Sequence, residues 1–138
     1  MTSMLARAEA PFSRDLLHVV TDTGRFALDI EVAETEAQKR LGLMFRTTIA
    51  AGRGMLFPYA PAQEITMWMR NTYVSLDMVF IRADGVVHRV ETGTEPMSEA
   101  IIASRGDVSA VLEIAAGEAK RLGIRAGSRV EHPLFGPR

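Results

Sequence analysis

Five residues near the middle of the chain have the types and spacing of a small binding site. They are Trp68, Arg70, Asn71, Thr72 and Asp77, and they stand in or beside apolar runs. The planar guanidinium of Arg70 suits a carboxylate or phosphate, Asn71 offers a donor and an acceptor, and Trp68 offers a stacking surface. We therefore expect ligand-binding residues here, and we assign no catalytic residue, metal or cofactor.

The same residues also have a structural interpretation. Asn71 and Thr72 are typical turn residues, because their side chains bond nearby backbone groups. Asp77 would then accept hydrogen bonds from loop N–H groups, and Trp68 would fill the core. The sequence leaves both interpretations open.

A pair of carboxylates is a second possible source of chemistry. Asp77 beside Glu91 or Glu113 would share a proton and serve a hydrolase. A three-residue loop at 83–85 places Asp77 opposite Glu91, whereas a two-residue turn places it opposite Thr92. A solvated strand edge is the simpler interpretation of these charges.

Soft metal ligands are the third possibility. Met67 and Met69 alternate on a predicted strand and would suit Cu(I), although methionine more often fills a core. His18, His88 and His132 lack the spacing of a metal motif. We therefore predict no metal site.

Composition excludes several classes of protein. The chain has 138 residues, a net charge of -1 and no cysteine. It therefore has no disulfide or thiol chemistry, and no basic excess that would favour nucleic acid as a partner. No apolar run reaches the roughly 18 residues of a membrane helix, so we expect no integral membrane segment, and no signal peptide is visible.

Three predicted strands surround the candidate site. Residues 65–70 alternate along a strand, residues 76–81 form a strand that is largely apolar on both sides, and residues 86–91 would return antiparallel to it. Loop 71–75 would join the first two strands as a hairpin. Asp84-Gly85 would turn the second strand into the third, with Gly85 at positive φ.

The remaining pattern also favours strands. We expect strands at 16–20, 26–32, 54–57, 108–114 and 129–131, with Pro58 ending the third of these. Loops are expected at 59–63 and 92–107, and the second of these leaves room for a short strand around Ile101-Ile102. Thr35 and Gln38 form a capping-box pattern that begins one helix, which Gly42 ends, and residues 116–122 form a second helix.

These elements define a fold class and a core. Strands joined mostly by turns predict an α+β, mostly β domain whose mixed or antiparallel sheet curls into a partial barrel with two short helices. We expect core positions at Ala37, Leu41, Met44, Leu112, Ile114 and Leu122. Residues 1–13 are predicted to be a frayed arm, and residues 14–138 a single domain.

Several separated motifs resemble the DUF 192 family, a domain of unknown function. They are LGLMFR (41–46), GMLF (54–57), MWMRNT (67–72), LDMVFI (76–81) and VLEIAAGEAKRLGIRAGSRV (111–130). The resemblance implies a compact single domain, and it implies export in many bacterial members. This chain has Met67 where the family usually has an aromatic residue, and Ser128 where it usually has aspartate.

The end of that last motif, RLGIRAGSRV, also resembles the helix-turn-strand of AbrB-type DNA-binding barrels. Because the net charge speaks against DNA, we rank that function third. The prediction is a module that binds a small molecule or protein at a polar rim on a Trp68–Asp77 hairpin, and it is not expected to be an enzyme. A hydrolase using Asp77 is the alternative.

Overall fold

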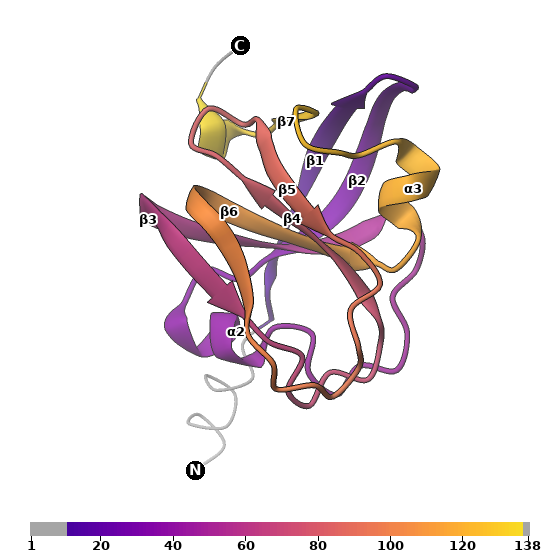
Figure 1. Ribbon diagram of the computed structural model, residues 1–138, viewed down its shortest axis with the longest axis vertical. Coiled ribbons are helices and arrows are strands. Elements are labelled where there is room, and N and C mark those ends of the chain that lie inside the picture. Colours follow the sequence, from indigo (N-terminus) through magenta and orange to yellow (C-terminus); the bar gives the residue numbers. More distant parts are fainter. Residues whose placement is uncertain (1–10, 137–138) are drawn as a thin grey trace.

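A computed structural model describes residues 11–136, in which seven strands form one sheet (Figure 1). The strands are β1 (Ser13–Thr21), β2 (Gly24–Val32), β3 (Arg53–Met67), β4 (Leu76–Ile81), β5 (Val87–Glu91), β6 (Ile102–Ala115) and β7 (Arg129–Glu131). Their order in the sheet is β5-β4-β6-β3-β2-β1-β7. Only the β2–β3 pair is parallel among these neighbours, so the sheet is mixed.

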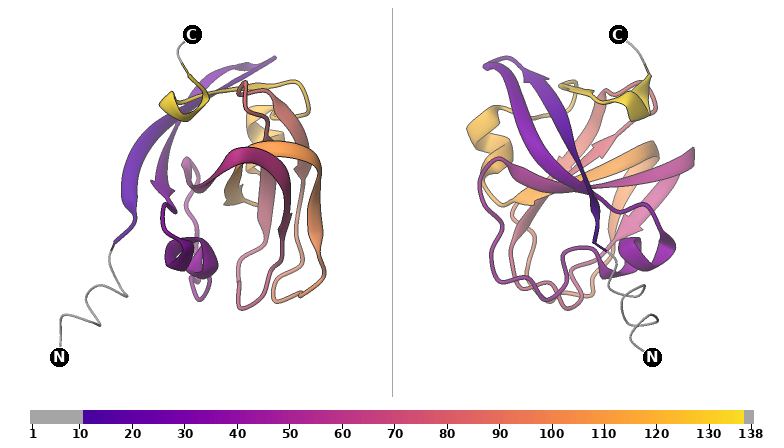
Figure 2. Two further views of the ribbon diagram at one scale, coloured as in Figure 1. Left: turned by 90° about the vertical axis from the view of Figure 1, so that its left-hand side faces the viewer. Right: turned by 180° about the vertical axis from the view of Figure 1, so that it is seen from behind.

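The sheet curls until its two edges touch, as the two views of Figure 2 show. Val86, just before β5, forms an antiparallel bridge with Arg129 in β7. The backbone N–H of Val87 donates to the carbonyl oxygen of Ser128 at 2.8 Å. The predicted mixed, mostly β partial barrel is therefore confirmed.

Three short helical segments accompany the sheet in the described residues: α2 (Glu36–Leu41), α3 (Glu118–Leu122) and the 3-10 turn η1 (Pro133–Phe135). Thr35 caps α2, its hydroxyl accepting from the backbone N–H of Gln38 at 3.0 Å, and the Gln38 side chain bonds back. The two predicted helices and the capping box are confirmed. The expected arm falls mostly on residues 1–10, outside the described residues, while Ser13 already belongs to β1.

Two hydrophobic cores lie on opposite faces of the central strands. The first core draws on all seven strands and α3, and includes Val79 of β4 and Leu112 of β6. The second core covers the other face of β3, β4 and β6, and includes Met55 and Met78. Every residue of β4 is buried, because both of its faces are covered. We call these two sides the first-core face and the second-core face.

The β4–β5 hairpin forms as predicted, with Gly85 at φ 84°. The Arg82 N–H donates to the carbonyl oxygen of Val86, so the loop has three residues. An irregularity between Phe80 and Ile81 then shifts the register, and Met78 rather than Asp77 lies opposite Glu91.

The prediction of a short strand ending at Pro58, a loop at 59–63 and a new strand at 65–70 was wrong. β3 runs unbroken from Arg53 to Met67. The ladder with β6 is irregular between Pro58 and Gln63, which removes the need for proline N–H groups there. β6 is also longer than expected, because residues 102–107 of the predicted loop pair with the end of β3.

The Trp68–Asp77 segment is not a hairpin, which corrects a second prediction. β3 pairs with β6, and β6 lies between β3 and β4 in the sheet. Because β3 ends at Met67, residues 68–70 lie beyond the strand. Met69 is fully buried in the second core and Met67 packs against the same core, but only Met67 belongs to β3, so the two do not alternate along one strand as the copper interpretation required.

The expected core contacts of the first helix were also wrong. α2 buries none of its residues, Ala37 is exposed, and Leu41 is 40% exposed, while Met44 in the turn after α2 is half-buried. By contrast, Leu112, Ile114 and Leu122 are buried as predicted. The first helix therefore stands away from the sheet, and a pocket lies beside it.

Candidate functional site

A pocket of about 590 Å³ lies between α2 with its following turn and the second-core face of the sheet. Phe57, Leu76 and Leu43 supply apolar walls. Figure 2 shows α2 across from the lower part of the sheet. We call this space the α2 pocket, and its volume is in the range of pockets that hold small organic ligands.

A glycine sets how closely the end of α2 approaches the sheet. Gly42 has φ 48°, and a Cβ atom there would lie 3.2 Å from the Phe57 ring. Its N–H donates to the carbonyl oxygen of Gln38 at 2.7 Å, which ends the helix. The chain therefore turns tightly at the pocket wall, where a side chain would strain the backbone and press on Phe57.

Glu113 forms part of the pocket lining from the middle of β6. Its neighbours across the sheet are Met55 and Met78, both fully buried. The residue is only 4% exposed, and burial raises the pKa of its carboxyl group to about 8. At neutral pH this side chain is therefore mainly a neutral carboxylic acid, which can donate a hydrogen bond.

The Glu113 carboxyl group has no hydrogen bond or ion pair with any described residue. No described side-chain polar atom is both sealed from solvent and without a partner. The Glu113 oxygens therefore remain accessible through the pocket. A polar group in this position is left to a ligand or water for its hydrogen bonds.

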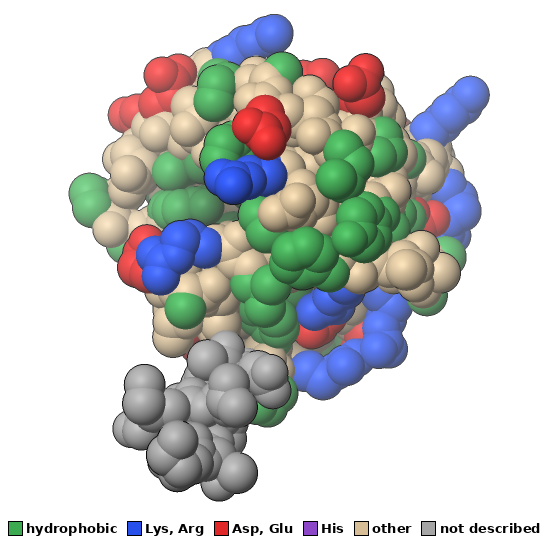
Figure 3. Space-filling model, turned by 90° about the horizontal axis from the view of Figure 1, so that it is seen from below, with side chains coloured by type: hydrophobic (Ala, Val, Ile, Leu, Met, Phe, Trp, Pro, Cys, Tyr) green, Lys and Arg blue, Asp and Glu red, His purple; other side chains and the backbone are tan. Residues whose placement is uncertain are grey.

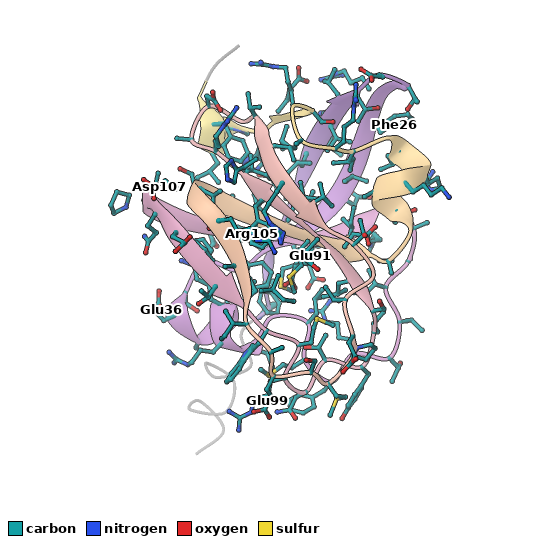
Figure 4. The ribbon with its side chains drawn as sticks, in the orientation of Figure 1. Phe26, Glu36, Glu91, Glu99, Arg105 and Asp107 are labelled. Atoms are coloured by element: carbon teal, nitrogen blue, oxygen red, sulfur yellow. The ribbon has the colours of Figure 1, made fainter. Side chains whose placement is uncertain are left out.

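Tyr59 and Lys39 form one side of the pocket. The Lys39 ammonium lies 4.5 Å from the centre of the Tyr59 ring, and the Tyr59 hydroxyl contacts the Met67 sulfur at 3.9 Å. Burial, followed by the charges of Glu113 and Glu36, raises the pKa of Tyr59 to about 12. The phenol is therefore neutral over the physiological range. Glu36 lies on α2 (Figure 4).

Four of the five predicted site residues line this pocket: Trp68, Arg70, Asn71 and Thr72. Trp68 is 41% exposed, which is inconsistent with a core-filling role. The Arg70 guanidinium lies 5.3 Å from the Trp68 ring centre and has no ion pair among the described residues. Both side chains are thus available at the mouth of the pocket.

Asn71 and Thr72 combine a structural role with their place in the lining. The Asn71 carbonyl oxygen accepts from the Phe45 N–H at 2.9 Å, and these two residues have φ 53° and 68°. The Thr72 hydroxyl donates to the Arg70 carbonyl oxygen at 3.0 Å. The rim is therefore held in an uncommon backbone conformation, of a kind often found at ligand sites.

Asp77 lies elsewhere, on the first-core face. Its carboxylate accepts from the backbone N–H groups of Gly93 at 2.9 Å and of Gly117 and Ala119 at 3.0 Å. This is the structural role that the sequence had left open. Asp77 therefore does not share a rim with Arg70, contrary to the prediction.

The two predicted carboxylate pairs do not form. Glu113 and Glu91 both neighbour Met78 on the second-core face, whereas Asp77 points to the other side of the sheet. Glu91, labelled in Figure 4, also forms an ion pair with Arg89. A hydrolase that uses Asp77 with either glutamate is therefore inconsistent with the structure.

No sequence pattern assigned Lys39, Arg40 or Tyr59 to a site, although all three line the pocket, and the role of Glu113 was misjudged. Lys39 and Arg40 were predicted only as part of the first helix, and Tyr59 as part of a loop. Glu113 had a readable signal, because it interrupts the apolar run Val111 to Ile114 in a strand predicted to be buried. No sequence signal joined it to α2, because that contact depends on the sheet order.

Exposed hydrophobic side chains gather around the same end of the molecule, and Figure 3 shows such a patch on the face seen from below. Leu41 and Trp68 line the pocket, while the rings of Phe45 and Tyr73 meet edge to face at 6.2 Å. Figure 3 also shows arginine and lysine side chains beside the patch. The pocket lining itself combines apolar and basic groups, since Arg40 and Arg70 line it together with Leu41 and Trp68.

Metal and membrane features are limited in what the structure describes. Residues 11–136 contain no group of three or more His, Asp or Glu side chains that could hold a metal ion. Within the same residues, no helix has the length and apolar character to cross a membrane.

The curled sheet with its α2 pocket defines a small, mostly β domain. The chain belongs to the DUF 192 family, described as Uncharacterized ACR, whose model matches residues 18–132. The expected family resemblance is therefore confirmed. No specific function is established for this family domain.

Two solved structures are similar over most of the chain. A protein from Sinorhizobium meliloti 1021, named only provisionally as a transcription regulator, is 40% identical, with a TM-score of 0.86, over 89% of this chain and 96% of its own. A protein of unknown function from Novosphingobium aromaticivorans DSM 12444 is 35% identical, with a TM-score of 0.84, over 92% and 96%. Comparison with curated proteins finds no match.

Proposed function

We propose that this protein is a binding module for a small molecule, and that the α2 pocket is its site. The observation that carries the proposal is Glu113, a buried carboxyl group that opens into the pocket without a protein partner. A buried polar group without a hydrogen bond costs about 1–3 kcal/mol, so it weakens the fold unless it serves another purpose. Binding is such a purpose.

The composition of the lining supports the same function. Phe57, Leu76 and Trp68 offer apolar and aromatic surface, while Arg70 and Asn71 add a few directed polar groups. A largely apolar cavity with few polar groups is the usual form of a small-molecule site. Among the described residues, none that lines the pocket is a nucleophile with an adjacent base, so we propose binding rather than catalysis.

Nucleic-acid binding is the second candidate, because one similar structure carries a provisional name as a regulator. With a net charge of -1, the chain lacks the basic excess that contacts phosphates. We expect no specific binding of duplex DNA. A salt-sensitive gel shift at sub-micromolar protein would reverse this ranking. Export from a bacterial cell, implied by the resemblance, remains a prediction.

A metabolite screen by NMR tests the proposed site. The chain has one tryptophan, so the indole N–H signal of Trp68 needs no selective labelling to be assigned. We expect compounds that shift this signal in the wild type. The shift should disappear in the variant that combines Arg70→Ala with Asn71→Ala.

The matched control is Arg129→Ala, an exposed arginine of β7 outside the pocket lining. Compounds that bind the wild type should still shift the Trp68 signal in this variant. Hits that leave the Trp68 signal unmoved, or that persist in the double variant, would place binding elsewhere and contradict the proposal.

A further inference from the structure

The chemistry of the α2 pocket narrows the class of ligand, and this inference rests on the proposed binding function. We propose that the pocket takes a small organic monoanion with an apolar body. Its anionic group lies at the basic rim, and a second, uncharged acceptor oxygen receives a hydrogen bond from the carboxyl group of Glu113. Ketocarboxylates have this combination of groups.

The charges at the rim of the pocket determine which charge the ligand should have. Three cationic side chains line the pocket, Lys39, Arg40 and Arg70, against one exposed carboxylate, Glu36. Lys39 lies 3.9 Å from that carboxylate, while Arg40 and Arg70 have no ion pair among the described residues. A guanidinium presents a planar set of donors that matches a carboxylate. The rim therefore favours an anion and repels an ammonium group.

The surroundings of Glu113 determine which group of the ligand it can bind. Glu113 lies between the fully buried Met55 and Met78, and no cationic side chain of residues 11–136 forms an ion pair with it. In such surroundings the neutral acid is favoured over the carboxylate, so the group offers an O–H donor. An ammonium group at this end would find a compensating charge only in an ionised Glu113, and the desolvation of such a buried ion pair is costly.

The walls between the rim and Glu113 determine the character of the ligand's body. Phe57 and Leu76 are apolar, and Tyr59 presents its ring under Lys39 with its hydroxyl turned to the Met67 sulfur. These groups offer contact surface and little further hydrogen bonding. The body of the ligand between its anionic group and its acceptor oxygen should therefore be apolar.

Other titratable groups surround Glu113 and must be separated from it in any pH test. Those facing the same pocket or face are Glu36, Lys39 and Arg40 from α2, Tyr59 from β3, Arg70 after β3, the Glu91–Arg89 pair on β5, and Glu31 of β2 with its ion-pair partner Arg46. The variant Glu113→Gln provides the separation. Its amide still donates a hydrogen bond, but it does not titrate.

The first experiment compares three probes of one shape by the Trp68 indole shift: hydrocinnamate, its amide and phenylpropylamine. We expect hydrocinnamate to bind about tenfold more tightly than either of the others, and to lose that advantage when Arg40→Ala and Arg70→Ala are combined. Equal binding of the three, or preference for the amine, would overturn the inference while leaving the α2 pocket as a binding site. If neither these probes nor a wider screen moved Trp68, both proposals would fall.

The second experiment tests the Glu113 donor with benzoylpropionate and phenylbutyrate, which differ by one keto oxygen. We expect the wild type and Glu113→Gln each to bind benzoylpropionate about three- to tenfold more tightly than phenylbutyrate. This gain in affinity from the keto oxygen should vanish in Glu113→Leu. Raising the pH well above 8 should remove the gain in the wild type but not in Glu113→Gln. A gain that survives in Glu113→Leu, or that is absent in the wild type, would overturn the assignment of this donor.

Discussion

Glu113 and Asp77 lie on neighbouring strands yet point to opposite faces of the sheet. Glu113 of β6 pairs with Met78 of β4, and Asp77 pairs with Ile114. One carboxyl group accepts three backbone hydrogen bonds, and the other accepts none from the described residues. A one-residue offset thus separates a structural acid from a candidate binding acid, because side chains alternate along a strand.

Asp77→Ala should destabilise the fold strongly. It would leave the N–H groups of Gly93, Gly117 and Ala119 without their acceptor, which we expect to cost about 2–5 kcal/mol in urea denaturation. Glu99→Ala, on an exposed loop (Figure 4), is the control and should change stability by less than about 0.5 kcal/mol. Equal midpoints for the two variants would contradict the structural role.

Leu112→Ala should create a cavity in the first core. Leu112 is fully buried on β6, so we expect a loss of about 2–5 kcal/mol in the free energy of unfolding. Leu16→Ala removes the same atoms from a residue that is 49% exposed and should cost much less. A thermal melt of Leu112→Ala within a degree of the wild type would show that the residue does not lie in this core.

Gly85→Val should strain the β4–β5 hairpin. Gly85 has φ 84°, which disfavours a β-branched side chain, and its N–H donates to the Arg82 carbonyl oxygen at 2.9 Å. The expected cost is about 1–2 kcal/mol in chemical denaturation. Gly85→Asn should lose less, since asparagine tolerates this conformation; the reverse order would argue against the turn.

Glu113 should make stability fall as the pH rises from about 4.5 to about 8. Its pKa is higher in the folded than in the unfolded chain, so the folded state binds more protons in this window and the unfolding free energy declines with pH. The decline approaches about 1.4 kcal/mol per pH unit. Glu113→Gln lacks this proton, and identical pH profiles for both proteins in urea denaturation would contradict the raised pKa.

Local patterns in the sequence predicted much of the fold. The capping box at Thr35, the turn at Gly85 and the apolar run of β4 each depend on neighbours in the chain, and each was predicted correctly. The break at Pro58 was wrong, because an irregular ladder with β6 accommodates the prolines. Local propensity could not show that irregularity.

The site was predictable only in part, for a related reason. Trp68, Arg70 and Asn71 line the pocket as a group, since they are adjacent in sequence. Glu113 and Tyr59 join them only because β6 lies next to β3, a long-range pairing that no local pattern reveals. The same insertion of β6 between β3 and β4 removed Asp77 from the predicted rim.

The pKa of Glu113, with and without a ligand, tests the central claim most directly. Its side-chain carboxyl signal can be followed by carbon NMR and assigned by its absence in Glu113→Gln. We predict a midpoint near 8 in the free protein, moving upward on saturation with benzoylpropionate, because the ligand accepts a hydrogen bond from the protonated form. A midpoint near the ordinary 4.5, or one that falls or stays fixed on saturation, would contradict a neutral Glu113 that binds the ligand.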